Sequence, residues 1–220
     1  MIVQRPAQIF KAYNRNTTVS EKYQCFSTLS TNRKSLSGCV TVFDEEILIP
    51  RNKKKYITEN DELVIIFPLI GVIEISDLED LEPIVLIPEE IQVLQLRKGQ
   101  SFSISIPYNK GVSNFLQIRV DDTSFSRKES FIYYEQNKLN LIMTAARSFC
   151  YFGVFDGRNE AVYLLQNKNN GVLVFVINGA FEIENRLLEN KDAIFLWDTK
   201  KVELEALSEN AIILLLEVPF

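Results

Sequence analysis

The chain has 220 residues, 46% of them hydrophobic and 24% charged, so it can bury one large core or two smaller ones. Its formal net charge of −5 argues against a basic surface that binds nucleic acid or an anionic membrane. The chain contains no histidine, which excludes Ser-His and Cys-His catalytic groups and imidazole-ligated metal centres.

The N-terminal sequence lacks the apolar core of a secretory signal, because polar residues interrupt it early. The longest apolar run, residues 211–216, is too short to span a bilayer. The three cysteines include no CxxC pair, which indicates reduced, mostly buried thiols and no structural zinc site. We therefore expect a cytoplasmic protein.

Short β-type runs separated by turn signals fill the first half of the chain. Residues 101–106 alternate serine with apolar side chains, as a half-buried strand does. The triplet Asp44–Glu46 reads as a turn between two such runs. The expected strands are 38–43, 47–49, 63–67, 72–75, 84–87, 91–96, 102–106 and 114–120.

The second half repeats this scheme after a polar, serine-bearing linker at residues 121–129. The expected strands are 149–155, 161–165, 193–197, 202–206 and 211–218, with the repeated hairpin at residues 172–183 between the second and the third. We expect two domains, formed by residues 1–122 and 123–220.

A twelve-residue phrase occurs in both halves. Residues 64–75 read VIIFPLIGVIEI and residues 172–183 read VLVFVINGAFEI, with five identities that include Gly71/Gly179. Self-similarity over a domain's length indicates a duplicated β module. The fold predicted is all-β, with two tandem cupin-like barrels or sandwiches (double-stranded β-helices) packed as a bicupin.

Several phrases resemble the pirin family, a family of bicupins, in the right order along nearly the whole chain. Residues 38–46 (GCVTVFDEE) resemble the family's strand with an "INED"-type turn, and residues 22–27 (KYQCFS) resemble "YHTFSF". Residues 88–92 (PEEIQ) resemble "PGDVQ", and residues 115–118 (FLQI) match "FLQI". Residues 185–219 follow the family's closing pattern.

The resemblance fails at the family's metal site, which uses three histidines and a glutamate. Counting from Gly71 places the first two ligands at Ile57 and Glu59, uncertain by one residue, and counting from Gly99 places the others at Ile104 and Ile106. Isoleucine offers no lone pair to a metal. We therefore expect no metal, no cofactor and no quercetin-dioxygenase-type activity.

A ligand pocket in the first barrel is the main candidate site, with no catalytic residue. Period-2 alternation places Gln117 and Arg119 on one face, and we expect Gln24, Tyr56 and Glu59 to join them at a pocket mouth. The alternative is a barrel filled by apolar side chains, with Ile57, Ile104 and Ile106 closing the cavity.

Two further candidates have simple alternatives. Glu59, Asp61 and Glu62 offer oxygen ligands for a hard cation, or they form a solvated acidic turn. The basic loop Arg51–Lys55 attracts an anionic ligand, or it is a solvated loop.

The function predicted is a non-catalytic pirin-like protein that binds a small molecule or a partner protein. The alternative is an enzyme that uses a residual carboxylate cation site near Glu59 and Asp61. A purely scaffolding protein with a filled barrel is not distinguished from the first by sequence. Neither a nucleic acid nor a membrane is expected as a partner, and the oligomeric state stays open.

Overall fold

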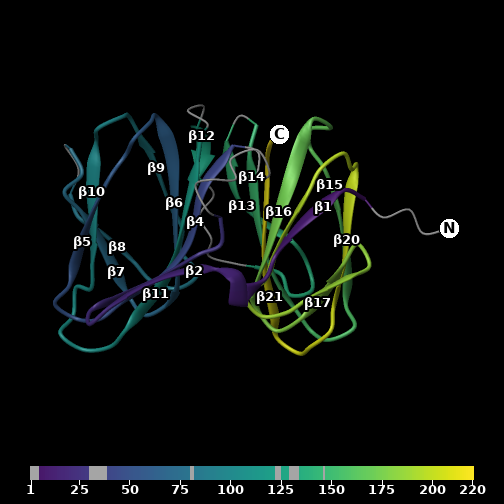
Figure 1. The fold of residues 1–220 in the computed structure, drawn as a ribbon, viewed down its shortest axis with the longest axis horizontal. Coiled ribbons are helices and arrows are strands. Elements are labelled where there is room, and N and C mark those ends of the chain that lie inside the picture. Colours follow the sequence, from purple (N-terminus) through teal and green to yellow (C-terminus); the bar gives the residue numbers. More distant parts are fainter. Residues whose placement is uncertain (1–4, 30–38, 80–81, 122–124, 129–133, 146) are drawn as a thin grey trace.

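The computed structural model contains two β-barrels that lie side by side (Figure 1). It describes residues 5–29, 39–79, 82–121, 125–128, 134–145 and 147–220. Within these residues the one helical element is a 3₁₀ turn, η1 (Ala12–Asn14). None of the described helical structure has the length and apolar character needed to cross a membrane. The predicted all-β bicupin architecture is confirmed.

The first barrel consists of two facing antiparallel sheets. The larger sheet has the order β2 (Asn16–Ser20), β3 (Tyr23–Ser27), β4 (Val40–Leu48), β11 (Ser113–Val120), β6 (Glu62–Ile70) and β9 (Gln92–Leu96). The smaller sheet has the order β5 (Lys53–Ile57), β10 (Ser101–Ser105), β7 (Ile73–Ser76) and β8 (Ile84–Leu86).

The second barrel repeats this order. Its larger sheet runs β1 (Ala7–Phe10), β19 (Ala193–Leu196), β16 (Asn170–Asn178), β21 (Ala211–Pro219), β14 (Phe149–Phe155), β13 (Asn140–Ala145) and β12 (Phe125–Lys128). Its smaller sheet runs β15 (Glu160–Leu164), β20 (Lys201–Ala206), β17 (Phe181–Ile183) and β18 (Arg186–Leu188). The repeated phrase forms β6–β7 in one barrel and β16–β17 in the other, as the duplication predicted.

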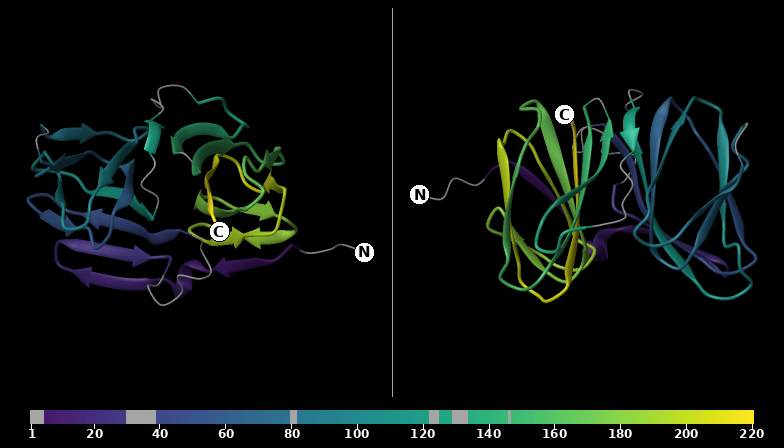
Figure 2. Two further views of the ribbon diagram at one scale, coloured as in Figure 1. Left: turned by 90° about the horizontal axis from the view of Figure 1, so that it is seen from above. Right: turned by 180° about the vertical axis from the view of Figure 1, so that it is seen from behind.

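The N-terminal strand belongs to the sheet of the second barrel. Ala7–Phe10 pairs antiparallel with β19, and the chain then crosses to β2 in the first barrel (Figure 2). Asp192 holds this crossing, because its carboxylate accepts hydrogen bonds from Lys11 Nζ at 2.5 Å and from the Ala12 N–H at 2.8 Å. The domain boundary expected at residue 122 falls outside the described residues. That division also assigns β1 to the first domain, although β1 pairs with a strand of the second barrel.

A core shared by the two barrels joins their larger sheets. Phe43 on β4 packs on Phe175 of β16 with ring centroids 4.9 Å apart, and Phe67 packs on Phe152 at 5.5 Å. Two further apolar clusters fill the barrel interiors, one in each barrel. The barrels are therefore packed on each other through buried side chains, which is a strong form of domain contact.

The turn predicted at Asp44–Glu46 is wrong, because β4 runs unbroken from Val40 to Leu48. Alternation along this strand sends Asp44 and Glu46 into the first barrel and Glu45 into the interface between barrels. Burial raises the pKa of the Glu45 carboxyl, but the charge of Lys191 and hydrogen bonds from Lys191, Arg15 and Asn114 outweigh it and lower the pKa overall.

Gly71 and Gly179 end the two repeated strands in the left-handed region, with φ of +75° and +82°. A Cβ at Gly71 would lie 2.5 Å from the carbonyl oxygen of Val112, so this turn requires glycine for both space and conformation. The sheet register shifts two residues before each of these glycines. Leu69 and Ile177 are therefore equivalent β-bulges.

Candidate functional site

A group of polar side chains gathers inside the first barrel around Glu46. Glu46 is fully buried, and its Oε2 accepts hydrogen bonds from Tyr56 Oη at 2.7 Å and Lys54 Nζ at 2.9 Å. Lys54 Nζ also donates to the Tyr23 hydroxyl and lies 3.6 Å from the centre of the Tyr23 ring. These residues come from β3, β4 and β5, so the group bridges the two sheets of the barrel.

Three more side chains extend this group along the larger sheet. Cys25 and Glu46 are directly opposite each other on β3 and β4, and one ligand-type atom from each of Cys25, Asp44 and Glu46 lies within 4.8 Å of the others. Gln117 on β11 is directly opposite Asp44, so the two side chains share the inner face. We call Cys25, Asp44, Glu46 and Gln117 the acceptor group.

The surroundings keep the hydroxyls and the thiol of this region protonated. Burial raises the pKa of Tyr56 far above its usual range, and the neighbouring Glu46 carboxylate raises it further. Burial and Glu46 act on the pKa of Tyr23 in the same direction. Burial also raises the pKa of the Cys25 thiol. Tyr56 and Tyr23 are therefore hydrogen-bond donors at neutral pH, and neither is a base.

Arg119 pairs with Glu62 near the end of β6. Arg119 Nη1 donates to Glu62 Oε1 at 3.1 Å, and both side chains are almost fully buried. Burial raises the pKa of the Glu62 carboxyl, and Arg119 opposes that effect without cancelling it. The partner that a buried Arg119 requires is therefore Glu62.

The predicted pocket residues separate into two sets. Tyr56, Gln117 and Arg119 lie on inward-facing positions of the first barrel. Gln24 alternates with the inward Cys25 and faces the other way, and Glu59 is exposed in the loop after β5. The structure thus brings three of the five together on the inner wall and leaves Gln24 and Glu59 outside.

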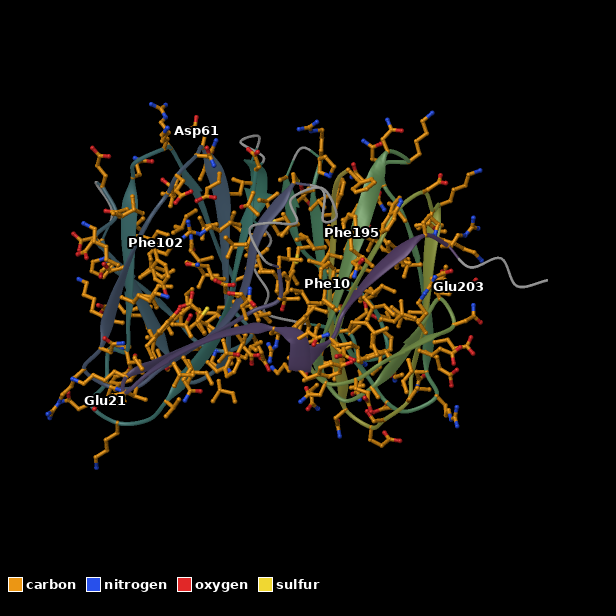
Figure 3. The ribbon with its side chains drawn as sticks, viewed as in Figure 1. Phe10, Glu21, Asp61, Phe102, Phe195 and Glu203 are labelled. Atoms are coloured by element: carbon orange, nitrogen blue, oxygen red, sulfur yellow. The ribbon has the colours of Figure 1, made fainter. Side chains whose placement is uncertain are left out.

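The carboxylate cation site predicted around Glu59 and Asp61 does not form. Asp61 lies in the loop at the end of the barrel, whereas Phe102 lies within it (Figure 3), and Asp61 accepts a hydrogen bond from the Lys98 N–H at 2.8 Å. Glu62 turns inward to Arg119. Across the described residues, the one group with metal-ligand geometry is Cys25, Asp44 and Glu46.

Residues 134–218 match the family described as the quercetinase C-terminal cupin domain. This match lies in the second barrel and covers less than half of the chain. Among solved structures the chain is similar to YhhW from Escherichia coli, with a TM-score of 0.83 and 14% identity over 97% of this chain and 98% of that chain. No curated protein matches significantly.

Two further structures share the bicupin fold. One is the bacterial pirin YhhW from Escherichia coli in complex with nickel(II), with a TM-score of 0.79 and 14% identity over 97% of this chain and 99% of that chain. The other is quercetin 2,3-dioxygenase from Acinetobacter baumannii, with a TM-score of 0.74 and 11% identity over 97% of this chain and 79% of that chain. At these identities the similarity establishes the fold alone.

The metal centre that a pirin-like fold implies does not fit the residues of this chain. The positions counted as the first two ligands, Ile57 and Glu59, both point away from the barrel, and Ile57 is 59% exposed. The count along the sequence passes the bulge at Leu69, and the inward residues are the neighbouring Tyr56 and Thr58. The Thr58 hydroxyl is already hydrogen-bonded to backbone carbonyls.

The other two counted positions, Ile104 and Ile106, are buried in the apolar cluster of the barrel, as the filled-barrel alternative expected; Ile57 does not take part in that filling. The inner wall at the implied centre therefore presents phenol, hydroxyl and isoleucine. Imidazole nitrogen is the ligand that suits iron, copper and nickel, and none of these side chains supplies it.

The second barrel has its own buried carboxylate, Glu217 on β21. Its oxygens accept hydrogen bonds from Tyr163 Oη at 2.5 Å, from Asn170 Nδ2 at 2.8 Å and from the N–H groups of Gln166 and Asn167. Every one of these donors is neutral. The Glu217 site closes the loop between β15 and β16, and its satisfied oxygens offer nothing to a ligand.

Sequence reasoning missed Cys25, Asp44 and Glu46. The local pattern assigns Asp44 and Glu46 to a turn, and it presents Cys25 only as a thiol without an activating base. One signal was present: in an alternating strand, Asp44 and Glu46 share a face with Leu48, which the structure buries in the barrel.

Proposed function

We propose that this protein is a pirin-like bicupin that has lost the family's histidine metal centre and acts as a non-catalytic binding or regulatory protein. The observation that carries the proposal is the inner wall of the first barrel. Tyr56, Thr58, Ile104 and Ile106 stand at or beside the positions that the resemblance assigns to ligands, in a chain without histidine. The quercetin 2,3-dioxygenation for which the Acinetobacter baumannii protein is named therefore has no metal support here.

The polar side chains of the first barrel favour a small molecule as the bound partner. Lys54 and Tyr23 offer polar groups, and the rings of Tyr56 and Phe102 stack beside them with centroids 4.9 Å apart. Small-ligand sites usually have an apolar wall with a small number of polar groups that point toward one another. Among the described residues, an exposed protein-binding face has no comparable cluster in its favour.

The test is metal-loaded turnover. The purified chain is stripped with a chelator, loaded in turn with Fe²⁺, Mn²⁺, Ni²⁺ and Cu²⁺, and assayed for oxygen uptake with quercetin, with a histidine-bearing bicupin dioxygenase as the positive control. We expect no oxygen uptake above buffer with any of the four metals. Metal-dependent quercetin cleavage by this chain would refute the proposal.

The rival enzyme hypothesis requires a cation at Glu59 and Asp61. Both are exposed, and Asp61 is engaged by the Lys98 N–H, so that hypothesis receives no support. A cytoplasmic location remains part of the proposal, in keeping with its reduced cysteines.

A further inference from the structure

We propose that the acceptor group binds one zinc-class divalent cation, with Cys25, Asp44 and Glu46 as ligands and Gln117 Oε1 as the fourth donor. This site differs in position and chemistry from the histidine centre of the family. Its ligands come from β3, β4 and β11, whereas the implied centre uses β5, β10 and the residues that directly follow these two strands.

The first argument is the spacing of the three ligand-type atoms. Cys25, Asp44 and Glu46 each place one such atom within 4.8 Å of the other two. Tetrahedral zinc, with bonds of about 2.0–2.3 Å to oxygen and sulfur, needs ligand atoms separated by less than this, so small side-chain movements suffice. The cross-strand pairing of Cys25 with Glu46 fixes their distance in the sheet.

The second argument is that the group contains buried acceptors without donors. Glu46 Oε1 and Gln117 Oε1 are both buried and have no hydrogen-bond partner among the described residues. Gln117 is 2% exposed and lies on the inner face opposite Asp44. An unpaired buried acceptor costs about 1–3 kcal/mol, and a cation placed between Asp44, Glu46 and Gln117 would remove that penalty.

The third argument is that Glu46 is already oriented for such a role. Lys54 and Tyr56 both donate to Oε2, and Oε1 has no hydrogen-bond partner among the described residues. Hydrogen bonds of this kind hold ligating carboxylates in place in metal sites. When the cation binds, the Cys25 thiol releases its proton to solvent. The thiolate, the two carboxylates and Lys54 then have a formal charge of −2, which one divalent cation neutralises.

The second barrel shows that the fold does not require these residues. The pairing of β11 with β4 and of β21 with β14 makes Gly153 the equivalent of Glu46. A Cβ at Gly153 would lie 2.4 Å from the Phe155 ring, so an aromatic side chain occupies that space. One barrel is thus closed by apolar packing where the other holds a carboxylate with a free oxygen.

The choice of cation follows from the donor set. A thiolate among the ligands disfavours Ca²⁺ and Mg²⁺ and favours zinc-class ions. Zn²⁺ does not change its oxidation state, so zinc bound here would not restore dioxygenase activity. The zinc site is therefore independent of the proposed loss of that activity. Failure of the zinc test would leave the quercetin result unaffected, and the reverse also holds.

The test uses the full chain after chelator treatment. Zn²⁺ is titrated by competition with a chromophoric chelator, and Co²⁺ is added to a second sample to record its absorption spectrum. We expect one equivalent of Zn²⁺ and a thiolate-to-Co²⁺ charge-transfer band in the near ultraviolet. Cys25→Ser and Asp44→Asn should each weaken Zn²⁺ binding by about 100-fold or more. Loss of a residue that only supports a ligand weakens metal binding by about 10–100-fold, and loss of a ligand should have at least the larger effect.

The matched controls are Cys39→Ser and Asp77→Asn, which make the same chemical changes elsewhere in the first barrel and should bind Zn²⁺ as the parent does. The Co²⁺ spectrum of the parent chain needs no variant, so it decides the question even where a variant fails to fold. Binding below half an equivalent, a Co²⁺ spectrum without the thiolate band, or unchanged affinity in Cys25→Ser would overturn the proposal.

Discussion

The interface between the barrels depends on Glu45, and replacing Glu45 by Gln tests this directly. Glu45 Oε2 accepts from Arg15 Nη1 at 2.7 Å, and Glu45 Oε1 contacts Lys191 Nζ at 2.8 Å and Asn114 Nδ2 at 2.9 Å. The side chain of Glu45 is 5% exposed, and those of Arg15 and Lys191 are 10% and 20% exposed. Glu45→Gln keeps the shape of the side chain and removes its charge.

The expected loss is near the lower end of the range for breaking a buried ionic group. Removing one partner of such a group costs about 3–5 kcal/mol, because the remaining charges stay buried. Arg15 and Lys191 retain some exposure and can partly rehydrate, so we expect about 3 kcal/mol. The Gln amide oxygen still accepts one hydrogen bond, which also favours the lower value.

Urea denaturation followed by intrinsic fluorescence measures this change. The midpoint should fall in Glu45→Gln while the slope stays that of the parent, since the unfolded surface is the same. Glu203→Gln, which removes an exposed pair with Lys201, is the matched control and should change the stability by less than about 0.5 kcal/mol. A loss in Glu45→Gln no larger than the control's would show that the Glu45 contacts do not hold the barrels together.

Three other predictions concern the barrels themselves. Burial raises the pKa of Tyr163 far above its unfolded value of 10.0, so the native state keeps this proton and the free energy of unfolding falls as the pH rises above 10. Tyr163→Phe should be less stable than the parent at pH 7, and urea titrations at rising alkaline pH should show the difference in free energy of unfolding becoming smaller. Gly71→Ala should cost more than Gly99→Ala, which is left-handed at φ +85° but meets open space and should cost about 1–2 kcal/mol; equal thermal shifts would contradict the close approach to Val112. Arg119→Met leaves Glu62 buried without its cation and should cost about 3–5 kcal/mol in urea, and a neutral result would mean that Glu62 takes up a proton at no cost.

The strands could be predicted from the sequence because most are bounded by glycine or polar turns and alternate cleanly. The strand predicted at residues 149–155 has the observed bounds, and the one at 211–218 agrees within one residue. The acidic triplet on β4 resembles a turn in the sequence, but two of its carboxylates, Glu45 and Glu46, are buried against partners from other parts of the chain. Glu45 meets Arg15 and Lys191, which are remote in sequence, and no local pattern in residues 44–46 reports such partners.

The site was predictable only where period-2 alternation held without a bulge. Gln117 and Arg119 follow strict alternation on β11, and both face inward as expected. Gln24 follows Tyr23 as the histidine follows the tyrosine in the family phrase "YHTFSF", and the expectation for Gln24 rests on that resemblance. Alternation on β3 sends its side chain outward. The expectation for Glu59 rests on a count that crosses a loop and the bulge at Leu69, which changes which residue faces inward.

The duplication separates structural polar groups from candidates for binding. The repeated phrase aligns Glu62 with Asn170, and the pairing of Arg119 with Val64 and of Glu217 with Val172 aligns Arg119 with Glu217. Each barrel thus closes this end with one buried carboxylate and one donor, on exchanged strands, and each carboxylate is satisfied. The position held by Arg119 in one barrel and by Glu217 in the other accepts a cation or an anion, so its role is to close the end of the barrel.

Glu46 differs from both carboxylates, because one of its buried oxygens remains unpaired and its equivalent in the other barrel is a glycine covered by a phenyl ring. That asymmetry makes the acceptor group, and not the Arg119 pair, the part of the first barrel that is built to receive something else.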